Sequence, residues 1–276
     1  MMNFTFGDSL PIFSKAHFQW GLQTDYVGRR FVYRPVSEST MDDARRMAER
    51  FNLPAGALVL AESQTAGRGR AGRAWVSPPD VNLYFTVLLF PAVNALRPLA
   101  WVTPLAVALA VEEVAQGQGA KVVADLKWPN DVLIAGKKVA GVLIETENLG
   151  EKFVALVGVG VNVNLEMADH PEISDIATSV KEAIGLKVAR EDVLAAFCNH
   201  FERLYEESLG GSRQPFEMWR ERLITLGQTV VAPGIDGQVE GRAVDVEEDG
   251  ALVIATADGR RQRVEAGDVL PTVGQA

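Results

Sequence analysis

The chain has 276 residues, a formal net charge of −9 and 47% hydrophobic residues. This hydrophobic content excludes a disordered chain, and the acidic balance argues against general nucleic-acid binding, which needs clustered Lys and Arg. We expect no membrane-spanning apolar run, and the N-terminus lacks the ordered features of a secretory signal. The single cysteine, Cys198, excludes an intramolecular disulfide, so we expect a reduced, cytoplasmic protein with this thiol buried.

The first predicted elements follow a lead-in of about 35 residues that carries short strands near 31–33. A helix is predicted from Ser39 or Thr40, as the N-cap, to Phe51, because Asp42 and Asp43 fall in its first turn, where the helix dipole favours negative charge. Strands over 57–64 and 82–90 and a buried helix over 98–116, with Pro104 as a candidate kink, complete this half.

The second half continues with strands and then changes character. Strands are predicted over 125–134, interrupted by Pro129, then over 138–147 and 153–164, with a hairpin at Ala135–Gly136. Amphipathic helices are predicted over 191–207 and 216–224. From about residue 226, short strands over 238–246, 251–256 and 261–264 alternate with turn signals, which indicates a second, small β domain.

The segment from Gly67 to Trp75 interleaves three glycines with Arg68, Arg70 and Arg73. Glycine lets the backbone approach a ligand closely, and arginine offers a fixed fork of donors that matches phosphate and carboxylate oxygens. The segment is therefore predicted to fold over an anionic ligand.

A second segment, Lys127–Asp131, precedes a lysine-containing hairpin at Lys137 and Lys138. Arginines and a lysine next to an Asn-Asp pair suit a phosphate-and-carboxylate site, and an Asp there suits Mg²⁺. Neither a nucleotide-binding G-x-x-x-x-G-K-[ST] loop nor a reliable Ser-His-Asp order is present. The residues alone indicate an enzyme that activates a carboxylate with ATP.

Together these segments resemble the biotin protein ligase family over about residues 22–270. The motifs that carry the resemblance are, in order, Ser39-Thr40, Gln64, Gly67–Trp75, Lys127–Asp131, Lys138–Gly141, Gly158–Asn162 and the C-terminal module. The resemblance implies an α+β fold: a class II synthetase-like biotin/lipoate ligase catalytic domain with a mixed sheet and flanking helices over 1–225, whose lead-in 1–21 has no assigned role. A small SH3-like β-barrel is expected over 226–276.

The resemblance also implies a two-step reaction. Biotin and MgATP would give biotinyl-5′-AMP and pyrophosphate, and a lysine of a biotin carboxyl carrier protein would then displace AMP. Biotin, ATP and Mg²⁺ are thus the expected ligands, and the carrier domain of a carboxylase is the expected partner. No DNA partner is expected, because the DNA-binding domain of repressor-type members is missing, and no membrane partner is expected. The sequence leaves open whether the chain is a homodimer.

Individual roles follow from the same resemblance. The expected catalytic residues are Lys138, Arg70 and Arg68, with Lys138 at the biotin carboxylate and the α-phosphate. The expected biotin-binding residues are Ser39, Thr40, Gln64, Gly67, Arg68, Lys138, Gly141, Gly158 and Gly160. The expected nucleotide-binding residues are Arg70, Arg73, Trp75, Lys127, Asn130, Asp131 and Asn162, and Asp131 is also the expected Mg²⁺ ligand.

Structural alternatives stay open for several of these residues. Ser39 could be a plain N-cap, Asn130 and Asp131 could cap a turn, and Trp75 could be core packing. Lys137 is expected to point away from Lys138 into solvent. Two other functions also stay open: a lipoate-protein ligase, which shares the catalytic fold, and a non-catalytic biotin-binding regulator, which would bind biotin without releasing pyrophosphate.

Overall fold

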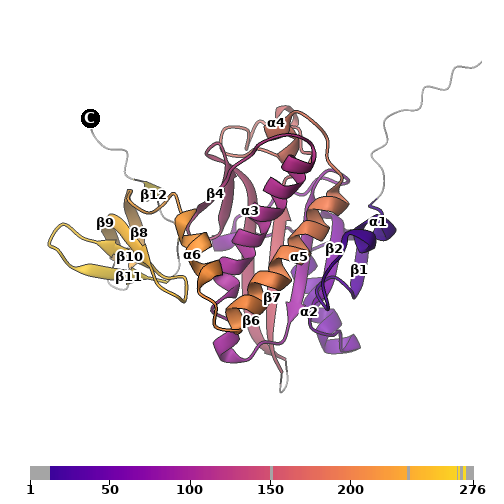
Figure 1. Ribbon diagram of the computed structural model, residues 1–276, viewed down its shortest axis with the longest axis horizontal. Helices are drawn as coiled ribbons and strands as arrows, with labels where there is room; N and C mark the ends of the chain where they lie inside the picture. Colours follow the sequence, from indigo (N-terminus) through magenta and orange to yellow (C-terminus); the bar gives the residue numbers. More distant parts are fainter. Residues whose placement is uncertain (1–12, 150–151, 235–236, 266, 268–269, 272–276) are drawn as a thin grey trace, which may run out of the picture.

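A computed structural model describes residues 13–149, 152–234, 237–265, 267 and 270–271. The expected lead-in therefore lies outside the described residues as far as residue 12. Figure 1 shows a larger α/β body that carries a small β unit on one side.

The larger body is built on a mixed seven-stranded sheet with the order β1-β2-β3-β7-β6-β5-β4. Its strands are β1 (Phe31–Ser37), β2 (Ala57–Gln64), β3 (Leu83–Leu89), β4 (Ala124–Lys127), β5 (Asp131–Ile134), β6 (Lys137–Leu149) and β7 (Lys152–Val161). Only β1 and β2 pair in parallel; the other described pairs are antiparallel. The inner strand β3 is buried along its whole length, which its run of aromatic and aliphatic residues explains.

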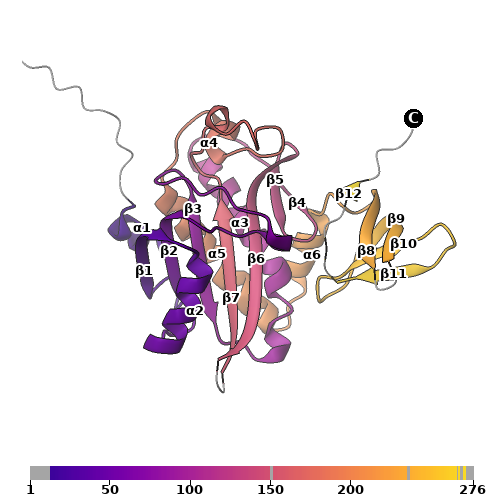
Figure 2. The ribbon, with the colours of Figure 1, turned by 180° about the vertical axis from the view of Figure 1, so that it is seen from behind.

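Helices cover both faces of this sheet. The long helices α3 (Leu99–Gly117) and α5 (Arg190–Leu209), with α6 (Gln214–Glu221), lie on one face, and α2 (Thr40–Phe51) lies on the other (Figures 1 and 2). The short helix α1 (Lys15–Gly21) packs against α5, and α4 (Val180–Ile184) follows β7. Because α2 leaves much of its sheet face uncovered, that face has room for a site.

The helix α3 corrects one expectation from the sequence. The helical stretch Val93–Gly117, 25 residues long, contains a window with a mean hydropathy of 1.4, so an apolar run of membrane-spanning length is present. However, 72% of that window is buried inside the protein. The helix is apolar all round because it packs between the sheet, α5 and α6.

The small unit is a five-stranded antiparallel sheet with the order β11-β10-β9-β8-β12. Its strands are β8 (Thr229–Gly234), β9 (Gly237–Val246), β10 (Leu252–Ala255), β11 (Arg261–Val264) and β12 (Leu270–Pro271). Two indole N–H groups of the larger body donate hydrogen bonds to its backbone: Trp128 to the carbonyl of Gly250 at 2.7 Å and Trp101 to the carbonyl of Glu248 at 3.0 Å. The α+β fold with a small C-terminal β domain is thus confirmed.

Most predicted elements are confirmed, with informative differences. The expected strand 125–134 is two strands, since the chain turns at a cis Trp128–Pro129 peptide bond. The helices α1 and α4 were not predicted because they have only 7 and 5 residues and no apolar periodicity of useful length. Strand β8 was not predicted either, because it ends in Pro233-Gly234, a pair that is typical of turns.

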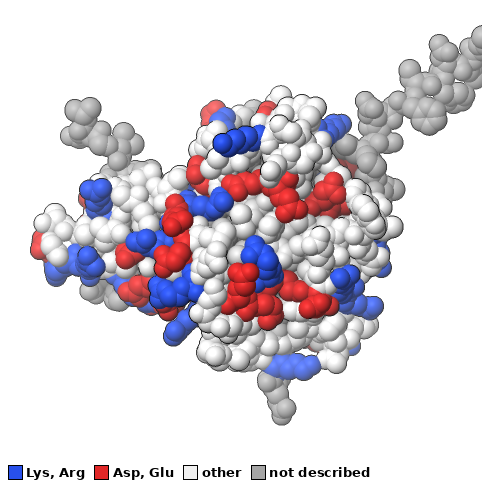
Figure 3. Space-filling view, in the orientation of Figure 1, with Lys and Arg blue, Asp and Glu red and all other residues white. Residues whose placement is uncertain are grey.

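Ion pairs join charged side chains at several places on the described surface. Figure 3 shows basic side chains interspersed with acidic ones on the face that carries α3 and α5. One such pair, Arg222 Nη1 with Glu112 Oε1 at 2.7 Å, ties the end of α6 to α3. The side chains of this pair are partly buried, whereas fully exposed ion pairs contribute little to stability.

A buried ion pair behaves differently. The Oε2 atom of Glu62 on β2 lies 2.5 Å from Nη1 of Arg190 at the start of α5. The side chains of Glu62 and Arg190 are 5% and 4% exposed. Burial alone would raise the pKa of Glu62, but the hydrogen bonds and charge of Arg190, with help from Tyr33, hold it below its usual range. The pair therefore stabilises the fold above the unfolded-state pKa of Glu, and this contribution is lost as the pH falls through the lower folded-state pKa.

We expect Arg190→Met to lower the free energy of unfolding by about 3–5 kcal/mol, because it leaves a buried carboxylate without its partner. Urea denaturation at neutral pH measures the loss. The control is Arg203→Met, also on α5, whose exposed pair with Glu207 is worth about 0.3–0.5 kcal/mol. Equal stabilities for the two variants would contradict this reading of Glu62.

Candidate active site

A cavity of about 480 Å³ opens on the sheet face that carries α2. It is bounded by the start of α2, the end of β2, the segment 68–76, strands β4 to β7 and the segment 173–177. Of the residues expected from the sequence, those that line it are Ser39, Thr40, Gln64, Arg68, Arg70, Arg73, Trp75, Lys127, Asn130, Asp131, Lys138, Gly141, Gly158, Gly160 and Asn162. Residues more than 120 positions apart in the sequence thus meet at one site.

The floor of the cavity is a strip of sheet without side chains. Gly141 on β6 pairs with Gly160 on β7. A Cβ atom on Gly160 would lie 2.5 Å from Trp75 Cε2, and one on Gly141 would lie 3.0 Å from Trp75 Cζ3. A Cβ on Gly158 would lie 2.8 Å from Met41 Sδ. These glycines are therefore required by close approach of other side chains, and the indole of Trp75 lies directly on the backbone of the two strands.

Trp75 packs on the sheet and also lines the cavity. Its indole N–H is buried and has no hydrogen-bond partner among the residues that the structure describes. An unpaired buried donor is costly, so an acceptor atom of a ligand in the cavity would be stabilising there.

Lys138 provides a positive charge inside the cavity. Its Nζ lies 2.5 Å from Asp131 Oδ1 and 5.3 Å from the centroid of the Trp75 ring. A register shift between β5 and β6 brings Lys138 to the same face as Gly141, although the two are an odd number of residues apart. Lys137, by contrast, is exposed, and its Nζ donates to the Ser174 carbonyl at 2.8 Å.

The opposite polar end is formed by Ser39, Thr40 and Gln64. The backbone N–H of Thr40 donates to Gln64 Oε1 at 2.9 Å, and the hydroxyl of Thr86 donates to that of Thr40 at 2.9 Å. Ser39 occupies the N-cap position of α2, but its side chain makes no capping hydrogen bond within the described structure. Its hydroxyl therefore does not serve as the plain cap that was the alternative.

The Gly/Arg loop, residues 67–75, is folded as a small hairpin. The backbone N–H of Gly69 donates to the Arg73 carbonyl at 2.7 Å, and that of Trp75 donates to the Gly67 carbonyl at 2.9 Å. At its tip Gly72 has a φ of 72°, a conformation that favours glycine. Gly67 is not among the described residues that line the cavity; a Cβ there would lie 2.8 Å from Ser77 Oγ, so this glycine serves the root of the hairpin.

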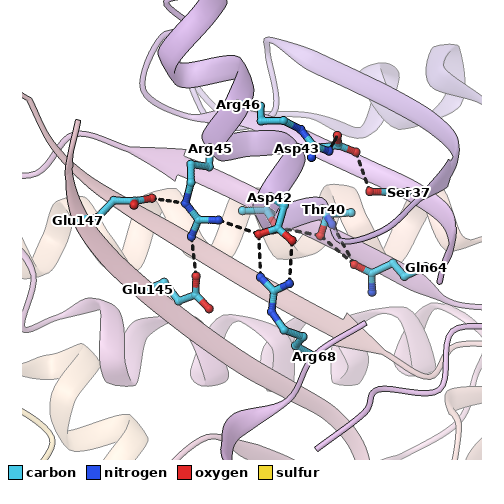
Figure 4. Close-up of polar contacts among 11 residues, drawn as sticks. Ser37, Thr40, Asp42, Asp43, Arg45, Arg46, Gln64, Arg68, Glu145 and Glu147 are labelled. Atoms are coloured by element: carbon cyan, nitrogen blue, oxygen red, sulfur yellow. Dashed lines mark hydrogen bonds and ion pairs between the residues drawn. The ribbon is translucent and has the colours of Figure 1, made fainter. Parts of the chain in front are cut away.

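Arg68 leaves the root of this hairpin towards α2. Its Nη1 and Nη2 donate to the two carboxylate oxygens of Asp42 at 2.7 and 2.8 Å (Figure 4). This hydrogen bond, more than burial or Arg45, holds the pKa of Asp42 below its usual range and raises the pKa of Arg68. Both groups are therefore charged at neutral pH.

Asn130 and Asn162 line the cavity but also hold its walls together. The side-chain amide of Asn130 donates to the Val142 carbonyl, and that of Asn162 donates to the Thr178 carbonyl at 3.1 Å. The amide of Asn130 thus bonds across to β6 and not within the turn that follows Pro129. Lys127 and Asp131 flank the buried Trp128, so one short segment serves both the cavity and the contact between the two domains.

The sequence missed one wall of the cavity and one carboxylate. Ile173, Asp175 and Ile176 line the cavity in a segment without helix or strand, and only its position after the glycine-containing β7 pointed to it. Asp42 was assigned to the helix dipole alone. No group of three or more His, Cys, Asp or Glu able to hold a metal occurs among the described residues. The single carboxylates Asp131 and Asp175 still suit Mg²⁺ that arrives with nucleotide phosphates, which needs only one or two protein carboxylates.

Comparisons with known proteins agree with this geometry. Residues 33–163 match the model of the Biotin/lipoate A/B protein ligase family, and residues 225–270 match the Biotin protein ligase C terminal domain. The chain is 33% identical to the Bifunctional ligase/repressor BirA of Bacillus subtilis over 251 residues, which cover 89% of this chain and 75% of that protein. It is 35% identical to the Biotin–[acetyl-CoA-carboxylase] ligase of Paracoccus denitrificans over 240 residues, 84% of this chain and 97% of that protein.

A solved structure is similar in fold as well. The biotin protein ligase from Aquifex aeolicus, in complex with biotin and ATP, superposes with a TM-score of 0.72 at 30% identity, covering 88% of this chain and 98% of that one. The family models match both the N-terminal and the C-terminal part of the chain, and this chain covers nearly all of the Paracoccus and Aquifex ligases. The chain belongs to the biotin protein ligase family.

Proposed function

We propose that this chain is a biotin–[biotin carboxyl carrier protein] ligase that forms biotinyl-5′-AMP from biotin and ATP and transfers the biotinyl group to a carrier lysine. The observation that carries the proposal is the cavity in which a neutral polar end, a lysine and the arginine loop meet. Its volume of about 480 Å³ lies within the range of small-molecule sites. The relatives named for biotin ligation support the same activity.

The two ends of the cavity suit the two ends of biotin. The ureido head is neutral and has both donors and acceptors, so it matches Ser39, Thr40 and Gln64. The carboxylate tail matches the ammonium group of Lys138. Lipoate has no ureido head, so the polar end favours biotin over lipoate.

In the first step, a carboxylate oxygen of biotin forms a bond to the α-phosphorus of ATP, and the bond from this phosphorus to the bridging oxygen breaks to release pyrophosphate. The reacting groups are both anionic, so positive charge at their meeting point lowers the barrier. We assign this role to Lys138, and the enclosure of the phosphates to Arg70 and Arg73.

In the second step, the amine of the carrier lysine attacks the acyl carbon, the mixed anhydride breaks, and AMP leaves. The chain contributes mainly by holding the reactants in line and by keeping water from the anhydride. Mg²⁺ bound with ATP would neutralise further phosphate charge, with Asp131 as its proposed ligand. A cytoplasmic location and the absence of a DNA partner remain predictions.

The proposal is tested by incubation of the full chain with biotin, MgATP and a biotin carboxyl carrier domain. Mass spectrometry of the carrier should show one biotinylated lysine, and pyrophosphate release should depend on biotin and not on lipoate. Biotin binding without pyrophosphate release would instead identify a non-catalytic regulator. Lipoylation of a matching acceptor domain would favour the lipoate ligase alternative.

Lys138→Ala should lower the rate of biotin-dependent pyrophosphate release by roughly 10²–10³-fold, because the charge repulsion at the reacting centre is then uncompensated. Thermal unfolding should show an intact fold. The matched control is Lys137→Ala, which removes the neighbouring, outward-pointing lysine and should release pyrophosphate at the wild-type rate. Similar rates for the two variants would rule out the role given to Lys138.

Gly160→Ala should weaken biotin binding at least tenfold, because the new Cβ would lie 2.5 Å from Trp75 Cε2 and would push the indole into the cavity. Titration calorimetry with biotin measures the change. Gly117→Ala, at the end of α3 with no atom within 4 Å of the added Cβ, is the control and should bind as wild type. Unchanged affinity of the Gly160 variant would mean that biotin does not use this part of the floor.

A further inference from the structure

We infer that Asp42 is a positioning residue for biotin: it holds the guanidinium group of Arg68 and thereby fixes the root of the Gly/Arg loop beside the polar end of the cavity. The inference rests on the proposed function. It gives Asp42 a role beyond that of an acidic residue in the first turn of a helix.

The contact between Arg68 and Asp42 is a bidentate ion pair. Both terminal nitrogens of Arg68 donate to separate oxygens of Asp42, at 2.7 and 2.8 Å. Such a fork-to-fork arrangement fixes the plane of the guanidinium as well as its distance. Two of its five N–H donors are used in this way, so three remain for a ligand or the loop backbone. The side chain of Asp42 is only 26% exposed, which limits screening by solvent.

Asp42 also forms a hydrogen bond with a second arginine, Arg45. Its Oδ1 accepts a hydrogen bond from Arg45 Nη1 at 2.7 Å, and Arg45 also donates to Glu145 and Glu147 at 2.7 and 2.5 Å (Figure 4). These two glutamates lie on β6 on the same face as Gly141, because alternate residues of a strand share a face. The loop is thus tied through Asp42 and Arg45 to the strand that forms the cavity floor.

The Asp42–Arg68 ion pair lies close in sequence to the residues proposed to bind the ureido head of biotin. Asp42 follows Thr40 by two residues in the first turn of α2, and Arg68 follows Gln64 by four residues after β2. Thr40 and Gln64 are hydrogen-bonded to each other at 2.9 Å. A shift of the loop root would therefore move the wall next to the groups proposed to bind the ureido head.

The neighbouring Asp43 shows that position on the helix does not by itself produce this contact. It lies in the same first turn and serves the helix dipole equally well. Its carboxylate, however, accepts hydrogen bonds from Ser37 and Arg46, each at 2.6 Å, and points away from Arg68 (Figure 4). The chain thus offers a matched control within one residue.

The first experiment compares Asp42→Asn with Asp43→Asn in the full chain. For Asp42→Asn we expect the KM for biotin to rise about tenfold, while kcat and the KM for ATP stay within about twofold, since the reacting centre at Lys138 is untouched. Asp42→Glu should recover part of the loss. Asp43→Asn should keep the wild-type KM for biotin, whatever its melting temperature. An unchanged KM in Asp42→Asn, or tighter biotin binding, would overturn the inference.

A second experiment needs no ligand and no activity. Trypsin should cut the Arg68–Gly69 bond faster in Asp42→Asn than in wild type, because the released arginine can enter the protease. Asp43→Asn should be cut at the wild-type rate. Equal cleavage in all three proteins would overturn the inference even if the proposed function holds.

A double-mutant cycle separates the loss of the Asp42–Arg68 contact from a general loss of protein stability. Arg68→Lys keeps the charge but cannot use both carboxylate oxygens in parallel. If the two residues act through one contact, Asp42→Asn combined with Arg68→Lys should raise the KM for biotin no more than the worse single variant; additive effects would overturn the inference. If wild type neither binds biotin nor releases pyrophosphate, the proposed function fails, and the tryptic comparison still decides whether Asp42 holds the loop.

Discussion

The absence of side chains at Gly141, Gly158 and Gly160 is the constraint on which the rest of the site depends. In an ordinary strand pair, side chains at these positions would fill the space above the sheet. Here the space is left to Trp75, to Met41 and to the cavity, and a Cβ atom would lie only 2.8 Å from Met41 at Gly158 and 2.5 Å from Trp75 at Gly160. The loop, the lysine and the first turn of α2 can converge only because the floor is bare backbone.

Around this floor the polar groups are held by one another before any ligand arrives. Thr40 forms a hydrogen bond with Gln64. Lys138 forms an ion pair with Asp131, and Arg68 forms one with Asp42. Pairing of this kind fixes side chains that would otherwise lose rotamer freedom on binding. Each of the two cations, Lys138 and Arg68, has a carboxylate partner, which fixes its position.

Much of this architecture could be predicted from the sequence, for physical reasons that differ from part to part. The glycines and arginines of residues 67–75 and the Lys127–Asp131 segment identified the site because their residue types have few structural uses in that order. The buried run of α3 was readable as a core helix over almost the same residues, although its apolar character over a membrane-spanning length was not recognised. The helices α1 and α4 could not be predicted, because a segment of 7 or 5 residues is too short to show a helical periodicity.

The role of Asp42 shows why the remainder needed coordinates. An acid in the first turn of a helix has a sufficient explanation in the dipole, and Asp43 next to it has the same explanation. Only the tertiary structure distinguishes the two, by turning one carboxylate towards Arg68 and the other towards Arg46. The same holds for Trp128, whose motif pointed to the nucleotide while its indole binds the C-terminal domain at Gly250. A short motif can therefore serve two surfaces at once: Lys127 and Asp131 face the cavity, and the tryptophan between them couples the cavity wall to the neighbouring domain.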